Sequence, residues 1–415
     1  MPEPAPLRIA MLTYRGNPRS GGQGVYVRQL SRALVRLGHD VEVISGQPYP
    51  ELDPGVKLTE VPGLDLYRPD NPLRHRFPQP SELRDSIDEM EYDMMFNGHY
   101  PEPLTFSLRA RRVLQARVGE FDVVHDNQSL GTGIQGMRDD GHPVLATIHH
   151  PLAIDLELSR QDRPDRSEIA ERWYDFMEMQ GEVARALPLV LTVSETARRD
   201  IVANVGVLAE RMRVTPLGVD VGIFHPRDGV KPVPGRVFTM AAANVPLKGL
   251  RFLLEAMVLV RRQVPGAHLV VVSSGWDESD IPQRVADLGL AGAVTRLSDL
   301  SDEQVGEEYA RAEVAVVPSL YEGFSLPAVQ AMAAGVALVA TRAGALPEVV
   351  GEDRDTALLV DPGNEAALEE AITALLTDGP LRQRVRDNGR RWVHGRYSWN
   401  DCAQRTVAAY RELQP

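Results

Sequence analysis

Residues 313–335 read EVAVVPSLYEGFSLPAVQAMAAG, an apolar run followed by a short turn and a helix-like segment. The run at 313–319 shows no polar alternation, which is typical of a strand buried on both faces of a sheet. Pro327 suits the first turn of a helix because its φ is fixed and it has no N–H to donate. Gly335 suits the end of that helix. The stretch therefore predicts a strand–turn–helix unit of a parallel α/β sheet.

The same alternation of strands and helices runs through the whole chain. Strand-like runs occur in the first half at 7–13, 40–45, 121–126, 143–150, 189–194 and 212–218. They occur in the second half at 237–243, 268–274, 294–298, 313–319, 336–341 and 357–362. Helical periodicity at 25–37 and a capping box at 301–304, which opens a helix to Ala312, separate some of these strands. The pattern predicts an α/β fold of two Rossmann-like, doubly wound domains facing a cleft.

Residues 219–236 are rich in Pro and Gly and have no periodicity, which predicts a linker between the two domains. We expect a first domain at 1–218 and a second at 219–395. The remaining segment, 396–415, is expected to be a C-terminal helix that packs back on the first domain. Residues 63–103 are irregular, with many Pro, Met and charged residues, and are expected to be an elaborated loop region.

Composition narrows the classes of function. The chain has 415 residues, a net charge of −13 and a pI near 5.3, so nucleic acid is a poor candidate partner. Cys402 is the single cysteine, which excludes an intramolecular disulfide. No signal peptide and no apolar run of membrane-spanning length are present, so we expect a cytoplasmic protein. The stretches 68–76 and 109–117 are basic. We favour a solvated surface for both, and the alternative is that they contact an anionic acceptor or the headgroups of a membrane surface.

The mouth of the helix that Pro327 opens is a candidate binding site. A helix N-terminus presents unpaired N–H groups and a positive dipole end, to which phosphate binds. Gly323 lets the backbone approach a ligand, and Glu322 at its edge suits the hydroxyl groups of a sugar better than a phosphate. Gln330 lies further along the helix and is long enough to reach a group such as a ribose. Alone, this unit is common to many α/β proteins.

The stretch 318–350 closely resembles the donor-site signature of the family 4 retaining glycosyltransferases, which have the GT-B fold. Further matching segments follow in the family's order at 20–27, 147–150, 193–202, 215–224, 246–256 and 397–401. The resemblance covers nearly the whole chain. It implies a retaining glycosyltransferase that moves a sugar from a nucleoside-diphosphate sugar to an acceptor. The first domain would bind the acceptor and the second the donor.

The resemblance assigns roles to residues at the helix mouth. Glu322 matches the family glutamate that contacts the donor sugar. Gln330 stands where the family has a second glutamate that binds ribose hydroxyls, so we expect ribose binding to be weakened or rearranged. Backbone N–H groups of Phe324, Ser325 and Leu326 would hold the diphosphate or the sugar.

Two further matches lie after strands. A lone Lys is usually solvated, but Lys248 matches the family lysine that neutralises the departing diphosphate. The family's partner arginine is missing, and we expect Asn244 or Arg296 to compensate. His149 matches the family histidine that contacts the donor sugar. His150 should point to the opposite face of its strand, so the two histidines are not expected to share a metal.

The segment GGQG (21–24) follows the first strand and opens a helix. Alone it favours a helix cap or a flexible loop, and a dinucleotide fingerprint is disfavoured because Ser45 and Gly46 end the second strand without an acidic residue. The resemblance implies that backbone at Gly22, Gln23 and Gly24 approaches the donor phosphates and the acceptor.

The resulting hypothesis places Glu322, His149 and Lys248 at the reaction centre. A UDP-sugar is the favoured co-substrate, GDP- and ADP-sugars are alternatives, and no essential metal is expected, since the only DxD motif, at 353–355, lies in a turn. The acceptor is a small molecule, a glycan or a lipid. Two alternatives remain. One is a GT-B-like sugar-nucleotide epimerase. The other is a nucleotide-binding protein with decayed catalysis, which Gln330 and the missing arginine would explain.

Overall fold

The computed structural model describes residues 5–17, 22–66, 78–162 and 167–414. The chain divides into two compact units. Unit 1 comprises Met1–Val193, Arg198–Thr215 and Trp399–Pro415, and unit 2 comprises Ser194–Ala197 and Pro216–Ser398. The unit boundaries at Thr215 and Ser398 differ by a few residues from the domain limits expected at 218 and 395.

Within the described residues, unit 1 is built on a seven-stranded parallel sheet in the order β3-β2-β1-β4-β5-β6-β7. Its strands are β1 (Arg8–Thr13), β2 (Asp40–Ser45), β3 (Lys57–Glu60), β4 (Val123–Asn127), β5 (Val144–Ile148), β6 (Val190–Thr192) and β7 (Met212–Val214). Its helices are α1 (Gly22–Arg36), α2 (Ser86–Phe96), α3 (Glu102–Gln115), α4 (Thr132–Asp139), α5 (Ala153–Asp162), α6 (Ser167–Trp173), α7 (Phe176–Ala186), α8 (Glu195–Val205) and α16 (Trp399–Glu412). The first residues of α8 count with unit 2.

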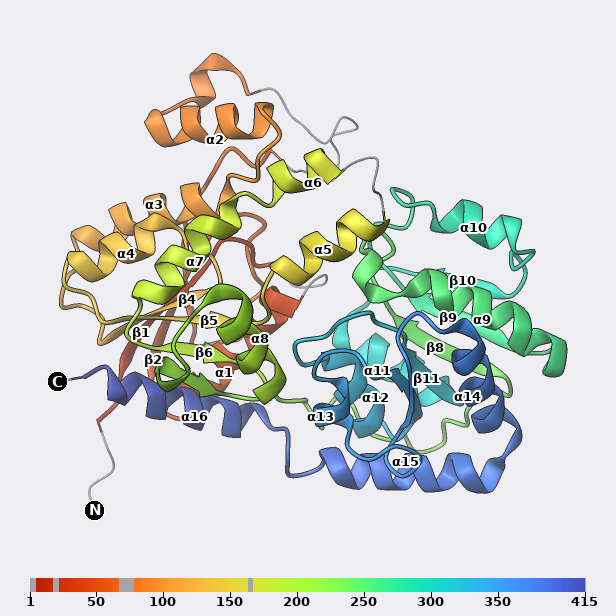
Figure 1. Cartoon of the computed structure of the whole chain (residues 1–415). Coiled ribbons are helices and arrows are strands. Elements are labelled where there is room, and N and C mark those ends of the chain that lie inside the picture. The colour runs from red at the N-terminus through yellow and green to blue at the C-terminus, as the bar shows by residue number, and fades with distance from the viewer. Residues whose placement is uncertain (1–4, 18–21, 67–77, 163–166, 415) are drawn as a thin grey trace. The chain divides into compact units, whose positions relative to one another are not determined.

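Helices cover both faces of this sheet, which explains why its central strands are buried on both sides (Figure 1). Side chains of α3, α4 and α7 pack on one face in a single core with strands β1, β4 and β5. Helices α1 and α16 contact each other and cover the other face. The buried hydroxyl of Tyr410, on α16, lies 2.7 Å from Nδ1 of His125 in β4. The last helix of the chain is therefore part of the core of unit 1.

Within the described residues, unit 2 is built on a six-stranded parallel sheet in the order β10-β9-β8-β11-β12-β13. Its strands are β8 (Arg236–Met240), β9 (His268–Val272), β10 (Val294–Leu297), β11 (Val314–Val317), β12 (Ala337–Thr341) and β13 (Leu358–Val360). Its helices are α9 (Leu250–Gln263), α10 (Ile281–Asp287), α11 (Asp302–Arg311), α12 (Leu326–Ala333), α13 (Leu346–Val350), α14 (Glu365–Thr377) and α15 (Gly379–Val393). The two sheets confirm the predicted fold class.

Local signals in unit 2 place its helices as the sequence predicted. The side chains of Ser301 and Gln304 form the predicted capping box, and α11 ends at Arg311. Pro327 lies in the first turn of α12, and Gly335, just beyond its end, has a φ of +71°. A left-handed residue at this point is the usual helix stop and favours glycine. The predicted strand–turn–helix unit at 313–335 is confirmed.

The region expected to be irregular, 63–103, contains a helix, so that expectation is wrong at 86–96. Helix α2 begins after Asp85, whose side chain accepts hydrogen bonds from the backbone N–H groups of Ile87 and Asp88. This is a standard N-cap, and a sequence signal for it was present in RDSIDEM. Strand β3 was also missed because its residues are exposed and mixed in polarity. Residues 67–77 lie outside the described residues.

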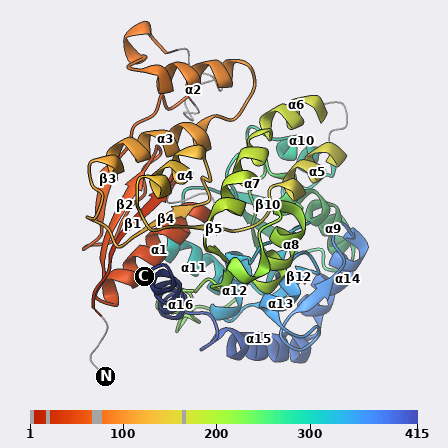
Figure 2. The ribbon, with the colours of Figure 1, turned by 60° about the vertical axis from the view of Figure 1, so that its left-hand side comes forward.

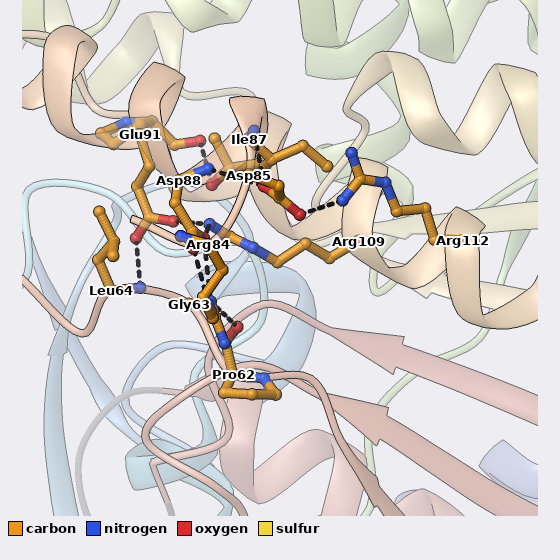
Figure 3. Close-up of polar contacts among 12 residues, drawn as sticks. Pro62, Gly63, Leu64, Arg84, Asp85, Ile87, Asp88, Glu91, Arg109 and Arg112 are labelled. Carbon is orange, nitrogen blue, oxygen red and sulfur yellow. Dashed lines mark hydrogen bonds and ion pairs between the residues drawn. The ribbon is translucent and has the colours of Figure 1, made fainter. Parts of the chain in front are cut away.

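Buried ion pairs fix α2 to α3 and to the segment at 62–64 (Figure 3). Asp88, which is fully buried, accepts hydrogen bonds at 2.7 Å from both Arg84 and Arg109. Glu91 pairs with the same Arg109 and accepts a hydrogen bond from the backbone N–H of Leu64 at 3.1 Å. Figure 2 shows α2 lying over α3 at the edge of unit 1. Helix α2 and residues 62–64 are thus held against α3 within unit 1.

The basic stretch 109–117 is neutralised inside unit 1. Besides Arg109, its members are paired as follows: Arg111 with Asp140, Arg112 with Asp85, and Arg117 with both Glu42 and Glu120. The stretch therefore does not offer a row of uncompensated cations. The other basic stretch, 68–76, falls outside the described residues. None of the helices in the described ranges is long and apolar enough to cross a membrane.

Candidate active site

In unit 2, the structure brings together Lys248 and Glu322, which are 74 residues apart in sequence. The amino group of Lys248 donates to Oε1 of Glu322 at 2.9 Å. The hydroxyl of Ser319, at the carboxyl end of β11, donates to the same oxygen at 2.7 Å. Glu322 is 8% exposed, so its carboxylate is held by two donors in a buried position. Sequence reasoning missed Ser319, although it is the last residue of a predicted strand.

A close backbone approach explains how Lys248 reaches Glu322. Gly249 has a φ of +65°, and a Cβ atom at this position would lie 1.9 Å from the carbonyl oxygen of Pro318. Only glycine therefore fits here. The backbone N–H of Leu320 donates to the carbonyl of Leu247 at 2.7 Å, which ties the turn before α9 to the loop after β11.

The turn into α12 carries strain and unpaired polar atoms. Ser325 adopts φ +85° and ψ +85°, a left-handed conformation that is costly for a residue with a side chain. Its hydroxyl is buried and has no hydrogen-bond partner among the described residues, and the same holds for Oε1 of Gln330. Such groups cost free energy in a folded protein and are commonly retained where a ligand binds. The turn into α12 therefore places a buried hydroxyl donor, Ser325, beside a helix N-terminus, where anions commonly bind.

The other residues predicted here have different surroundings. The ring of Phe324 packs edge-on against Tyr397 at 5.2 Å, so only its backbone is available to a ligand. Gly323 and Leu326 are partly exposed on either side of the turn. The side chain of Asn244 lies over Gly275, where a Cβ would meet its Cγ at 2.2 Å. Arg296 pairs with Asp277 at 3.1 Å, so neither proposed substitute for the family arginine shares a described contact with Glu322.

In unit 1, His149 follows β5 and is held from two directions. Its Nε2 lies 2.8 Å from Oδ1 of Asn127, and its backbone N–H donates to the side chain of Gln128 at 2.7 Å. The ring of Tyr26 meets it edge-on at 4.8 Å. Burial, with a smaller contribution from the neighbouring His150, lowers the pKa of His149 to about 3. The imidazole is therefore neutral at physiological pH.

His150 makes its own contacts, but β5 ends at Ile148, so neither histidine lies on the strand from which opposite orientations were expected. Its Nε2 lies 2.9 Å from a carboxylate oxygen of Asp155 in α5. Within the described residues, no three His, Cys, Asp or Glu side chains are grouped so that they could hold a metal ion. In the DxD motif, Asp353 pairs with Arg342 and Asp355 accepts from Asn388, which are contacts within unit 2.

The glycine-rich segment opens α1, as predicted. Gly22, Gln23 and Gly24 form its first turn. A Cβ at Gly24 would lie 1.9 Å from the carbonyl oxygen of Asn17, so glycine is required there. The carbonyl of Gln23 accepts a hydrogen bond from Nδ2 of Asn127 at 3.4 Å. Asn127 thus joins the glycine segment to His149. Sequence reasoning missed it, although it directly follows a predicted strand.

A buried chain of hydrogen bonds lies behind His149 in unit 1. His125 lies between the hydroxyls of Tyr410 and Thr147, at 2.7 Å from each. Thr147 in turn lies 3.0 Å from the hydroxyl of Tyr26. Because Tyr26 packs against His149, the chain connects α16 to the histidine.

Two parallel-sheet units with charged and polar side chains at the carboxyl ends of their strands are the architecture of a GT-B glycosyltransferase. The model of glycosyl transferases group 1 matches residues 224–392, and that of glycosyltransferase family 4 matches residues 20–222. A relative named MMP alpha-(1->4)-mannosyltransferase, from Mycolicibacterium hassiacum, is 49% identical over 408 residues, which cover 98% of each chain. The protein belongs to this glycosyltransferase family and is a glycosyltransferase.

More distant relatives and solved structures agree with this class. A D-inositol 3-phosphate glycosyltransferase from Pseudarthrobacter chlorophenolicus is 28% identical and covers 90% of this chain and 88% of its own. Sucrose-phosphate synthase from Thermosynechococcus elongatus matches with a TM-score of 0.77 at 23% identity, covering 98% and 99% of the two chains. Anabaena Alr3699/HepE in complex with UDP-glucose matches with a TM-score of 0.72 at 16% identity, covering 98% and 100%. The structures support the fold, and none of these comparisons supports an epimerase or a protein with decayed catalysis.

Proposed function

We propose that this protein transfers a mannosyl residue from a nucleoside-diphosphate mannose to a saccharide acceptor, with retention at the anomeric carbon and without a metal ion. The arrangement of Lys248, Ser319 and Glu322 beside the first turn of α12 is the observation that carries the proposal. The choice of mannose rests on the relative that is 49% identical over nearly the whole chain.

Unit 2 would bind the donor. The first N–H groups of α12 and the amino group of Lys248 supply positive charge for the diphosphate, which is the role that a metal ion has in many other transferases. The carboxylate of Glu322 accepts hydrogen bonds from sugar hydroxyls and orients Lys248 through their ion pair. Gln330 has an oxygen without a partner among the described residues, which suits a ribose hydroxyl.

In the proposed reaction, the bond between C1 of mannose and the β-phosphate oxygen breaks, and the nucleoside diphosphate leaves. Lys248 and α12 stabilise the charge that develops on the leaving group. The acceptor oxygen forms its bond to C1 on the same face, and its proton passes to the departing phosphate oxygen.

His149 would orient the donor sugar from unit 1. The oxygen of Asn127 accepts the proton on Nε2, so the neutral ring has an unprotonated Nδ1. This nitrogen can accept a hydrogen bond from a sugar hydroxyl. Because the pKa of His149 is lowered to about 3, this role is kept throughout the neutral pH range.

The test measures transfer and binding separately. Release of nucleoside diphosphate from GDP-mannose and UDP-mannose is followed with and without EDTA, and NMR of the product reports the anomer. We expect one of the two donors to be used, unaffected by EDTA, with an α-linked product. Lys248→Ala should lower kcat by about 10²–10³, whereas the exposed control Lys231→Ala should not. No turnover with either donor, or an inverted product, would contradict the proposal.

A further inference from the structure

Aromatic side chains gather at one place in unit 1, although aromatic residues make up only 6% of the chain. Tyr100 is at the centre, with its ring centroid 5.0 Å from that of Trp173, 5.4 Å from Phe176 and 6.4 Å from Tyr14. The ring of Tyr174 stacks with Phe176 at 6.3 Å. Tyr14, Tyr100, Trp173, Tyr174 and Phe176 are called the aromatic cluster below.

Three separate segments form the aromatic cluster. Tyr14 follows β1, Tyr100 precedes α3, and the other members lie at the junction of α6 and α7. Polar contacts bind the second segment to the third, since Nδ1 of His99 lies 2.5 Å from a carboxylate oxygen of Asp175. The ion pairs of Arg109 with Asp88 and Glu91 hold α3 to α2 (Figure 3). The cluster is therefore built on fixed elements.

The aromatic cluster borders the half of the candidate site in unit 1. The hydroxyl of Tyr14 interacts with the side chain of Gln23, whose carbonyl is bound by Asn127. Asn127 in turn holds His149. Asp155, which pairs with His150, is close enough to raise the pKa of Tyr174, in addition to the larger effect of burial.

Some rings of the aromatic cluster are buried and others are partly exposed to solvent. Tyr100 and Phe176 are buried, at 9% and 8% exposure, while Tyr14, Trp173 and Tyr174 are half-buried. Buried rings thus support rings whose remaining surface is accessible. Aromatic rings supply rigid, amphipathic contact area with little loss of conformational entropy, which suits a ligand with both apolar C–H groups and hydroxyls.

The charge beside the cluster is compensated. Arg15 donates from Nη2 to Oε1 of Glu102 at 2.9 Å, and the hydroxyl of Tyr100 donates to Oε2 at 2.8 Å. A phosphorylated ligand needs a cation that is not already neutralised. The pairing of Arg15 with Glu102 therefore favours an uncharged ligand at this place.

We propose that the accessible surfaces of Trp173 and Tyr174 form a subsite for a neutral pyranose ring of the acceptor saccharide. This inference rests on the proposed function and specifies the class of acceptor. It distinguishes the protein from its relatives named for D-inositol 3-phosphate, which carries a phosphate.

The experiment uses the full-length protein and α-(1→4)-linked mannotriose as the probe. Binding of mannotriose is measured first by saturation-transfer NMR without any donor, for wild type, Trp173→Ala and Tyr174→Ala. We expect each variant to weaken binding by about three- to tenfold. The control Trp392→Ala removes a half-buried tryptophan from unit 2 and should leave mannotriose binding unchanged. Thermal unfolding shows that each variant is folded.

Kinetics then separate the acceptor from the donor. In the transfer reaction, Trp173→Ala should raise KM for mannotriose by about three- to tenfold and leave KM for the donor within about twofold. D-inositol 3-phosphate should not compete with mannotriose. Glu102→Gln removes the charge that neutralises Arg15, and should allow this anion to compete.

Several results would overturn the subsite. They are absence of mannotriose binding, equal binding by wild type and Trp173→Ala, and competition by D-inositol 3-phosphate in the wild type. Binding of mannotriose is measured without a donor, so the two proposals can fail separately. If the protein binds mannotriose through Trp173 but uses neither nucleotide mannose, the result contradicts the proposed function and supports the subsite.

Discussion

The amino group of Lys248 lies 2.9 Å from Oε1 of Glu322, so two residues assigned to different parts of the donor form an ion pair with each other. Before a donor binds, Glu322 fixes the position of a long and flexible side chain. When a diphosphate arrives, Lys248 is already oriented and can interact with both anions. Preorganisation of this kind lowers the cost of stabilising charge in a transition state.

Glu322→Gln should lower kcat by about 10²–10³, because Lys248 loses its ionic partner and the sugar loses a charged acceptor. Affinity for the nucleoside diphosphate alone should change less, since that ligand does not include the sugar. Steady-state rates and calorimetry with GDP and UDP measure the two effects. Glu352→Gln, an exposed substitution in the same unit, is the control. A fall in diphosphate affinity as large as the fall in kcat would show that Glu322 does not act through the sugar.

Gln330→Glu should tighten nucleoside-diphosphate binding by about fivefold, which corresponds to about 1 kcal/mol. A carboxylate can accept hydrogen bonds from two ribose hydroxyls, whereas the amide has one acceptor atom. Calorimetry without metal measures the change. The matched control is the 2′,3′-dideoxy nucleotide, for which the substitution should bring no gain. An equal gain with the dideoxy nucleotide would mean that Gln330 does not bind the ribose.

Ser325→Gly should raise the stability of unit 2 by about 1 kcal/mol, because glycine adopts the left-handed conformation without strain. Ser325→Ala keeps the strain and removes only the hydroxyl, so the comparison of the two variants separates backbone from side chain. Differential scanning calorimetry measures the unfolding temperatures. If Ser325→Ala is stabilised as much as Ser325→Gly, relief of backbone strain is not the cause.

Substitution of Asp88 should lower the free energy of unfolding much more than substitution of Glu91. Burial would raise the pKa of Asp88, but hydrogen bonds from Arg84 and Arg109 outweigh it and hold the pKa well below its usual range. Asp88→Asn should therefore destabilise the protein by about 3–5 kcal/mol, as expected when one partner of a buried ion pair is lost. Burial raises the pKa of Glu91 in spite of Arg109, so Glu91→Gln should cost much less or stabilise. Urea unfolding at pH 7 compares the two variants.

The pH dependence of stability follows from the same pair. The ionised form of Asp88 is favoured in the folded state, so its contribution is complete above the unfolded pKa of about 3.9. This contribution is lost as the pH falls toward the lower folded pKa. The contribution of Glu91 to stability has the opposite sign, because its raised pKa disfavours the ionised form in the folded state. This contribution becomes less unfavourable as the pH falls. Wild type should lose more stability than Asp88→Asn between pH 5 and pH 3, and equal losses would contradict this assignment.

The sequence predicted those parts of the fold that depend on local pattern. Strands buried on both faces, such as β11, appear as short apolar runs with turns on either side, and the capping box at Ser301 marks the start of α11 directly. Strand β3 could not be predicted in this way because its four residues are exposed or half-exposed. Helix α2 is fixed by buried charges rather than by an apolar stripe, so its periodicity was weak.

The candidate site was predicted less completely than the fold, and mainly from the family resemblance. The resemblance to a known family supplied Glu322, Lys248 and His149, and their roles stay predictions until they are measured. Residues that position them, such as Ser319 and Asn127, have no pattern of their own, because a polar residue at a strand end is common. The members of the aromatic cluster lie in distant parts of the sequence, and only folding brings Trp173 to Tyr100.

The position of α16 has a consequence for how the protein is made. The hydrogen bond between Tyr410 and His125, and the packing of α16 on α1, belong to the core of unit 1. Unit 1 therefore combines strands that precede unit 2 in the sequence with a helix that follows it. One face of its sheet is covered by α1 alone until residues 399–412, which follow all of unit 2 in the sequence, have been added. Domains generally fold as units during synthesis, so unit 2, although later in the sequence, should complete its folding first.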